Sequence, residues 1–84
     1  MNIGQTVTWT SGALGSEKTK TGKVLAIVRA GQSVMALIPE SAKKSHIKTS
    51  TDRSSFDRVL VEVPAGRDGN IKHYYTPNLS MFDR

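Results

Sequence analysis

Residues 21–39 hold two apolar runs separated by a short turn, and this stretch constrains the fold most. The runs at 24–28 and 34–38 are rich in β-branched side chains, and the turn at 30–33 contains Gly31. Such a pattern predicts a β-hairpin. Both alternating sets of side chains are apolar at the centre of the first run, which is typical of a strand that is buried on both faces or bends from one sheet into another. We therefore predict a small barrel.

Three further segments predict strands. Residues 5–10 alternate Val7 and Trp9 with threonines, the period of a half-buried strand. Residues 57–64 alternate three valines with polar side chains, and residues 71–76 return after an Asp-Gly pair of the kind that closes hairpins. Together with the two apolar runs, these segments give five strands. The expected fold class is all-β, a strongly bent five-stranded antiparallel barrel.

The segments between the strands are mostly polar. Residues 11–20 are rich in Gly, Ser and Thr and are expected to form an exposed loop. Residues 40–55 are expected to contain one helical turn at 40–44 and then an irregular, mobile course. Residues 79–82 are expected to plug one end of the barrel as a short strand or a helical turn. The predicted organisation is one domain over residues 1–84, with a long polar loop at about 40–55.

Several short patterns resemble a known group of small barrels. The pattern G-x-x-V-x-W at residues 4–9, followed by G-K-V-x-x-I at 22–27, resembles the opening of Src-homology-3-like barrels of the KOW and Tudor type, in which a Gly-Lys-Val turn leads into the second strand. Residues 55–64 and 74–80 are similar to small bacterial and phage proteins. The resemblance implies a ligand-binding module, often for nucleic acid or a protein tail, without catalysis. No aromatic cage is evident, so reading of methylated side chains is not expected.

The chain is basic, with 12 Lys and Arg against 7 Asp and Glu and a net charge of +5. The excess lies in two blocks, since residues 17–30 hold four basic side chains against one acidic, and residues 41–58 hold five against two. Basic surfaces attract polyanions through counterion release and long-range attraction. The side chains expected to contact phosphates are Lys18, Lys20, Lys23, Arg29, Lys43, Lys44 and Lys48. The alternative is that these charges only keep a small protein soluble.

Aromatic side chains offer a second candidate feature. Tyr74 and Tyr75 are adjacent, so they must point to opposite faces of a strand. Tyr74 alternates with Lys72 and Thr76, and we expect its ring to be exposed and able to stack on a nucleic-acid base. The alternative is that it packs against a neighbouring strand. Trp9 shares its face with Val7 and is expected in the core.

Catalytic and metal-binding patterns are missing from the sequence. There is no Gly-x-Ser-x-Gly elbow and no glycine-rich phosphate loop that opens a helix. Cysteine is absent, and neither His46 nor His73 has a second ligand at metal-binding spacing. No run approaches the roughly 18 apolar residues that span a bilayer, and the N-terminus lacks the order of a signal peptide. We expect a cytoplasmic protein without enzyme activity, metal or cofactor.

The function expected is a non-catalytic binding module, with nucleic acid, either DNA or RNA, as its partner. The alternative is a protein-interaction module of a bacterium or phage that binds a host or partner protein, for instance through an acidic surface. A third reading is a homodimer formed by exposed strand edges. The partners expected are thus nucleic acid or an acidic protein surface, with no membrane, for a monomer or a homodimer.

Overall fold

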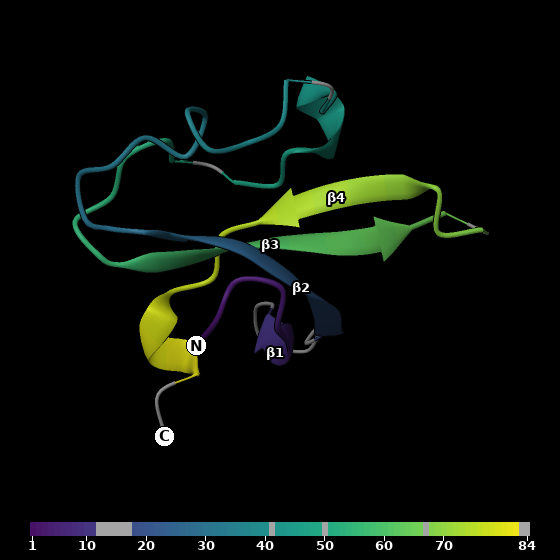
Figure 1. Ribbon diagram of the computed structural model, residues 1–84, viewed down its shortest axis with the longest axis horizontal. Helices are drawn as coiled ribbons and strands as arrows, with labels where there is room; N and C mark the ends of the chain where they lie inside the picture. Colours follow the sequence, from purple (N-terminus) through teal and green to yellow (C-terminus); the bar gives the residue numbers. More distant parts are fainter. Residues whose placement is uncertain (12–17, 41, 50, 67, 83–84) are drawn as a thin grey trace.

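Four antiparallel strands form a single sheet in the computed structural model, which describes residues 1–11, 18–40, 42–49, 51–66 and 68–82 (Figure 1). The strands follow each other in the sheet in chain order. They are β1 (Thr6–Ser11), β2 (Lys18–Val28), β3 (Arg58–Ala65) and β4 (Ile71–Tyr75), and two short 3₁₀ helices are η1 (Lys44–His46) and η2 (Leu79–Met81). The expectation of an all-β fold is confirmed. No helix in the described residues is long and apolar enough to cross a membrane.

The sheet packs on both of its faces. On one face Val7, Trp9, Val24, Val59 and Val61 form a buried cluster, against which residues of the chain end around η2 pack. On the opposite face a second buried cluster is covered by the long connection between β2 and β3, residues 29–57 (Figure 1). Burial on both sides of the apolar run 24–28 is therefore confirmed, as is the place of Trp9 in the core.

The prediction of a second hairpin strand at residues 34–38 is wrong. This run forms a turn in which the N–H groups of Leu37 and Ile38 donate to the carbonyl of Val34, at 2.9 and 3.2 Å. Val34 and Ile38 are four residues apart, so one helical turn places both side chains on the same side. Both are buried against the second face of the sheet. The run thus contributes to the core without joining the sheet.

Hydrogen bonds of Asp52 and Lys48 hold the long connection in place. The carboxylate of Asp52 accepts hydrogen bonds from the Ser33 hydroxyl and the Met35 N–H, each at 2.9 Å. Farther along, the N–H of Lys48 donates to the carbonyl of Tyr74 at 2.7 Å, which attaches the segment after η1 to the outer edge of β4. The expected helical turn at 40–44 is displaced toward the C-terminus, as η1.

Closure into a five-stranded barrel is not confirmed. β1 and β4 are the outer strands of the sheet, and the described residues contain four strands. Residues 79–82, for which a closing strand was one of two expectations, instead contain η2, which is the helical alternative. The pattern G-K-V at 22–24 is also not a turn but lies within β2.

Gly22 sits where two strands approach closely. A methyl group at this position would lie 2.5 Å from the carbonyl oxygen of Glu62 and 2.7 Å from a methyl carbon of Val61. Because the first of these atoms belongs to the backbone, the clash could be relieved only by moving β3. Glycine here therefore permits the pairing of β2 with β3. Farther along β2, between Val24 and Ala26, the register with β3 shifts. Such an irregularity turns the side chains of β2 relative to the sheet.

Candidate functional site

Basic and aromatic side chains from three parts of the chain meet near β4. Lys20 pairs with Trp9 in the register of β1 and β2, and Tyr75 pairs with Val61 in that of β3 and β4. Trp9, Val61 and Tyr75 pack in one cluster, so Lys20 and Tyr75 share that face of the sheet. The Lys20 ammonium lies 4.9 Å from the centroid of the Tyr75 ring, within the range of a cation–π contact. We call the group formed by Lys20, His46, Lys48, His73 and Tyr75 the β4 patch.

The two histidines of the β4 patch lie side by side. Their ring centroids are 5.2 Å apart, with His46 supplied by η1 and His73 by β4. Partial burial lowers the pKa of His73, and the nearby positive charges of Lys48, His46 and Lys20 lower it further. The uncharged imidazole of His73 is thus favoured at neutral pH, and the charge of the patch increases in acid.

Behind the patch, Trp9 fixes the position of the Tyr75 ring. The two rings meet edge to face, with centroids 5.9 Å apart and planes inclined by 67°, and Phe82 packs against Trp9 in a similar way at 6.1 Å. Edge-to-face contacts of this kind add stability beyond the burial of apolar area. Tyr75 remains partly exposed, whereas Trp9 is buried. The patch therefore presents to solvent an aromatic ring whose orientation is fixed by Trp9.

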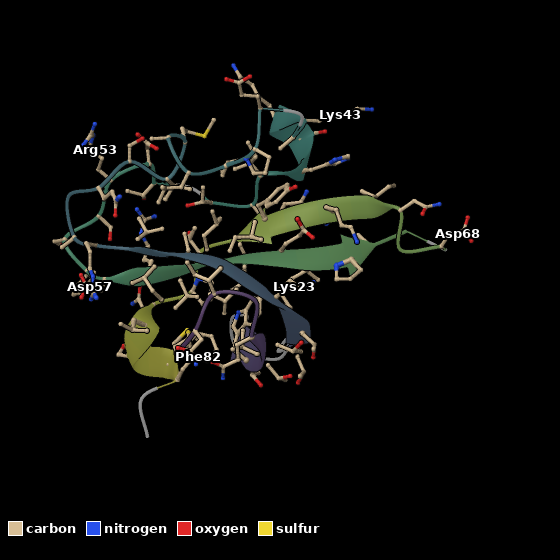
Figure 2. The ribbon with its side chains drawn as sticks, viewed as in Figure 1. Lys23, Lys43, Arg53, Asp57, Asp68 and Phe82 are labelled. Atoms are coloured by element: carbon tan, nitrogen blue, oxygen red, sulfur yellow. The ribbon has the colours of Figure 1, made fainter. Side chains whose placement is uncertain are left out.

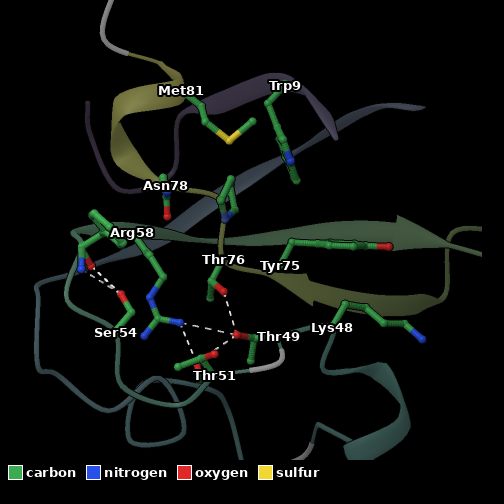
Figure 3. A pocket seen from close by; sticks show the side chains of 12 residues that line it. Trp9, Lys48, Thr49, Thr51, Ser54, Arg58, Tyr75, Thr76, Asn78 and Met81 are labelled. Carbon is green, nitrogen blue, oxygen red and sulfur yellow. Dashed lines mark hydrogen bonds between the residues drawn. The ribbon is translucent and has the colours of Figure 1, made fainter. Parts of the chain in front are cut away.

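A pocket of about 340 Å³ opens beside the patch at the end of β4. Trp9 and Met81 lie on one side of it, Thr49 and Thr51 on the other, and Tyr75 lies between (Figure 3). We call it the Arg58 pocket, after the cation in its wall. Among the described residues that line it, two are basic, Lys48 and Arg58, and none is acidic.

Arg58 is a buried cation without a carboxylate partner in the described chain. Its exposed fraction is 4%. The guanidinium donates to the backbone carbonyl of Thr51 at 2.6 Å and lies 3.5 Å from the Thr49 hydroxyl (Figure 3). It also donates to the backbone carbonyl of Asp52 at 2.8 Å. Its Nε is buried and has no hydrogen-bond partner among the described residues. Because arginine cannot lose its proton, this charge is stabilised only by neutral dipoles.

The structure brings only part of the predicted basic set together. Lys20 and Lys48 lie in the β4 patch. Lys43 and Lys44 are exposed at the start of η1, where Figure 2 shows Lys43. Lys23 pairs with Glu62 in the register of β2 and β3, on the opposite face of the sheet from Lys20.

Two further members of the predicted set lie apart from the patch or outside the description. Arg29 forms an exposed ion pair with Asp57 at 3.2 Å, and Asp57 lies at the far end of the molecule from Lys43 (Figure 2). The side chain of Lys18 lies outside the described residues. Exposed pairs such as that of Arg29 contribute little to stability.

The expectation that Tyr74 is the exposed ring is wrong. Tyr74 is 6% exposed and belongs to the buried cluster with Leu60 and Val34, while Tyr75 on the other face is the partly exposed ring. The reason is that the connection 29–57 covers the Tyr74 face, which its alternation with Lys72 and Thr76 did not reveal. Burial, followed by the charge of Glu62, raises the pKa of the Tyr74 hydroxyl.

Sequence reasoning did not select Arg58, Tyr75, His46 or His73 as site residues. Arg58 belongs to the basic block of residues 41–58, but its burial depends on Thr51 and Asp52, which contact it only in the folded chain. The strand pattern of 57–64 did not indicate this burial, because its alternation places Arg58 with Glu62 on the side opposite the three valines. No signal in the sequence indicated that η1 would bring His46 to His73.

A second groove runs along the free edge of β1. Its volume is about 560 Å³, and it is lined by residues 5–10 together with Met1, Met81 and Phe82. β1 is an outer strand that pairs only with β2 among the described strands. Unpaired backbone groups at such an edge can accept an added strand.

No protein-family model, curated protein or solved structure matches this chain. Among the residues that the structure describes, no three histidine, aspartate or glutamate side chains are grouped as metal ligands would be.

Proposed function

We propose that this protein is a non-catalytic module that binds nucleic acid through the β4 patch. The observation that carries the proposal is the position of Lys20, whose ammonium lies 4.9 Å from the centroid of the partly exposed Tyr75 ring, with Lys48 and His46 near His73 on the same side. Cations close to an aromatic ring can bind the phosphates of a nucleic-acid strand while the ring stacks on one of its bases.

The arrangement favours single strands over duplexes. In a single strand the bases are free to stack on an aromatic side chain, and the phosphates track a basic surface. Tyr75 supplies the ring, and Lys20 and Lys48 supply charges close to it. The flanking lysines at 43 and 44 extend the positive surface along η1.

Fluorescence anisotropy with single-stranded DNA, duplex DNA and RNA at several salt concentrations tests the proposal. We expect measurable affinity near physiological salt, with single strands preferred. Each lysine that contacts a phosphate contributes roughly 0.7 to the slope of log affinity against log salt for a single strand. Lys20→Ala should weaken binding and reduce that slope.

Lys23→Ala is the matched control. Lys23 follows Lys20 closely in β2 but is exposed on the opposite face, across from Glu62. The two variants remove the same charge, so a general effect of net charge would lower affinity equally in both. Equal losses, or binding that disappears for all probes at physiological salt, would contradict the β4 patch as the interface.

The groove at the edge of β1 supports a second candidate function, the binding of an extended peptide of a partner protein. Strand addition supplies backbone hydrogen bonds, and Met1, Met81 and Phe82 offer apolar contacts to alternate side chains of the added strand. Replacement of Val7 is unsuitable as a test because it is buried. Thr8→Pro, at an exposed position of the outer strand, would instead remove a backbone donor, and partner binding that survives it unchanged would exclude this edge.

A further inference from the structure

The Arg58 pocket combines a polar side with an apolar side. Thr49 and Thr76 face it with hydroxyl groups that hydrogen-bond to each other at 2.9 Å, and Arg58 lies beside them. Across the pocket lie the ring of Trp9 and the side chain of Met81 (Figure 3). A ligand that fits must therefore be polar at one end and flat or apolar at the other.

The charge of the pocket favours an anion at its polar end. The two acidic residues that most closely precede Arg58 in the chain are engaged elsewhere, since Asp52 accepts from Ser33 and Met35, and Asp57 accepts from the Ala30 N–H at 2.9 Å and pairs with Arg29. No acidic side chain lines the described wall. Water is partly excluded around Arg58, so an anion brought close to it would interact more strongly than one at the surface.

The size of the pocket agrees with one nucleotide unit. Pockets of about 300–1,000 Å³ hold small organic ligands, and the volume here is about 340 Å³. A nucleoside phosphate has the required distribution, with an anionic phosphate at one end and a flat base at the other. Tyr75 belongs both to the pocket and to the β4 patch, so a strand that lies across the patch would have the pocket beside it.

We propose that the Arg58 pocket binds one nucleoside phosphate unit, with its phosphate toward Arg58, Thr49 and Thr76 and its base against Trp9, Tyr75 and Met81. This proposal rests on the nucleic-acid binding proposed above, because it assigns the pocket to one nucleotide of the bound strand. The ammonium of Lys48, which now donates to the Ser45 carbonyl at 3.0 Å, lies on an exposed side chain at the pocket and can turn to the phosphate.

NMR titration gives a direct readout at both ends of the pocket. The Nε–H of Arg58 reports on the polar end, and the indole N–H of the chain's single tryptophan reports on the apolar end. Added nucleoside 5′-monophosphate should shift both resonances. The unphosphorylated nucleoside should bind more weakly, and inorganic phosphate should shift Arg58 without Trp9. Nucleotide that shifts neither resonance at millimolar concentration overturns the proposal, and phosphate that reproduces every nucleotide shift overturns the base contact.

Met81→Glu tests the pocket without disturbing the core. Met81 is 38% exposed. A carboxylate there would replace an apolar contact to the base with a charge that must lose water, and it would also repel the phosphate across the pocket. We expect the affinity for nucleoside monophosphate to fall about tenfold or more. The control is Met35→Glu, which adds the same charge at a methionine that is 48% exposed and does not line the pocket. Its affinity should stay within about twofold of the wild type because the charge is screened from the site. Equal losses in the two variants would overturn the assignment.

The two proposals fail in different ways. If oligonucleotides bind with a dependence on Lys20 while Met81→Glu changes neither mononucleotide nor oligonucleotide affinity, the pocket assignment is wrong and the β4 patch stands. If no oligonucleotide binds at any salt concentration while the monophosphate shifts Arg58 and Trp9, the nucleic-acid function is wrong, and with it the assignment of the pocket to a nucleotide of a bound strand.

Discussion

The guanidinium of Arg58 donates a 2.6 Å hydrogen bond to the backbone carbonyl of Thr51, and this contact joins the first residue of β3 to the long connection that precedes it. The same side chain donates to the carbonyl of Asp52 and lies in the wall of the pocket. One residue thus shapes the fold of the connection and the charge of the candidate site.

Arg58→Met should lower the free energy of unfolding by roughly 2 kcal/mol, because hydrogen bonds from a charged donor to two carbonyls are lost. The methionine retains most of the buried volume, so the effect of a cavity is small. Urea denaturation followed by tryptophan fluorescence measures the change. If Arg58→Met proves as stable as the wild type, the guanidinium does not hold the connection.

Gly22→Ala should destabilise the fold by about 1–3 kcal/mol, the usual cost of adding a methyl group where there is no space. The added methyl would lie 2.5 Å from the carbonyl oxygen of Glu62 and would force β2 and β3 apart. Thr21→Ala, at the exposed neighbouring position, is the control and should cost much less. Thermal unfolding of the two variants compares them, and equal melting temperatures would refute the close approach.

Leu60→Ala should cost roughly 2–5 kcal/mol, as buried leucines do when they are truncated in a core. Leu60 has no exposed surface, and it contributes to the cluster beneath the 29–57 connection. Ile71→Ala on β4 removes a similar apolar volume from a side chain that is 42% exposed and should have a small effect. Chemical denaturation distinguishes them. A loss at Leu60 no larger than at Ile71 would mean that the connection does not pack on this face.

The stability of the protein should fall as the pH drops below about 6.5. The folded pKa of His73 is lower than its usual value of 6.5, owing first to burial and then to the charges of Lys48, His46 and Lys20. The unfolded chain therefore takes up a proton before the folded chain does, and the free energy of unfolding decreases between pH 6.5 and the lower folded pKa. Above pH 6.5 this contribution is constant.

Denaturation at pH 8, 7, 6 and 5 measures this dependence, and His73→Asn should reduce it. Asp52 and Asp57 do not interfere, since hydrogen bonds, chiefly from the N–H groups of Met35 and Ala30, hold the pKa of each carboxyl below 3.8. Their stabilising contribution is present above that value and is lost only in stronger acid. A wild type and a His73→Asn variant with the same pH profile would contradict the lowered pKa of His73.

Local patterns in the sequence determined the strands that alternate cleanly. Val7 and Trp9 in residues 5–10 and the valines of 57–64 predicted β1 and β3 to within about one residue, because a half-buried strand repeats every two positions. The Asp-Gly turn predicted the return of the chain into β4 in the same way. Burial on both sides of 24–28 followed from its apolar side chains on both faces.

The run 34–38 shows the limit of such patterns. A short apolar run suits a buried strand and a buried turn equally well, and its periodicity over five residues does not separate the two. Asp52, which lies 17 residues after Met35, decides the outcome by accepting the N–H of Met35. That contact exists only after the chain has folded back on itself.

The sequence alone determined an all-β protein with a basic surface and a buried Trp9, because composition and two-residue alternation report on each strand by itself. The tertiary structure decided which tyrosine is exposed, which lysines gather and where Arg58 is buried. Coverage of the Tyr74 face by residues 29–57, the meeting of His46 with His73, and the contacts of Arg58 with Thr51 and Asp52 all join distant parts of the chain. Such contacts depend on the path of the whole chain, which no local pattern contains.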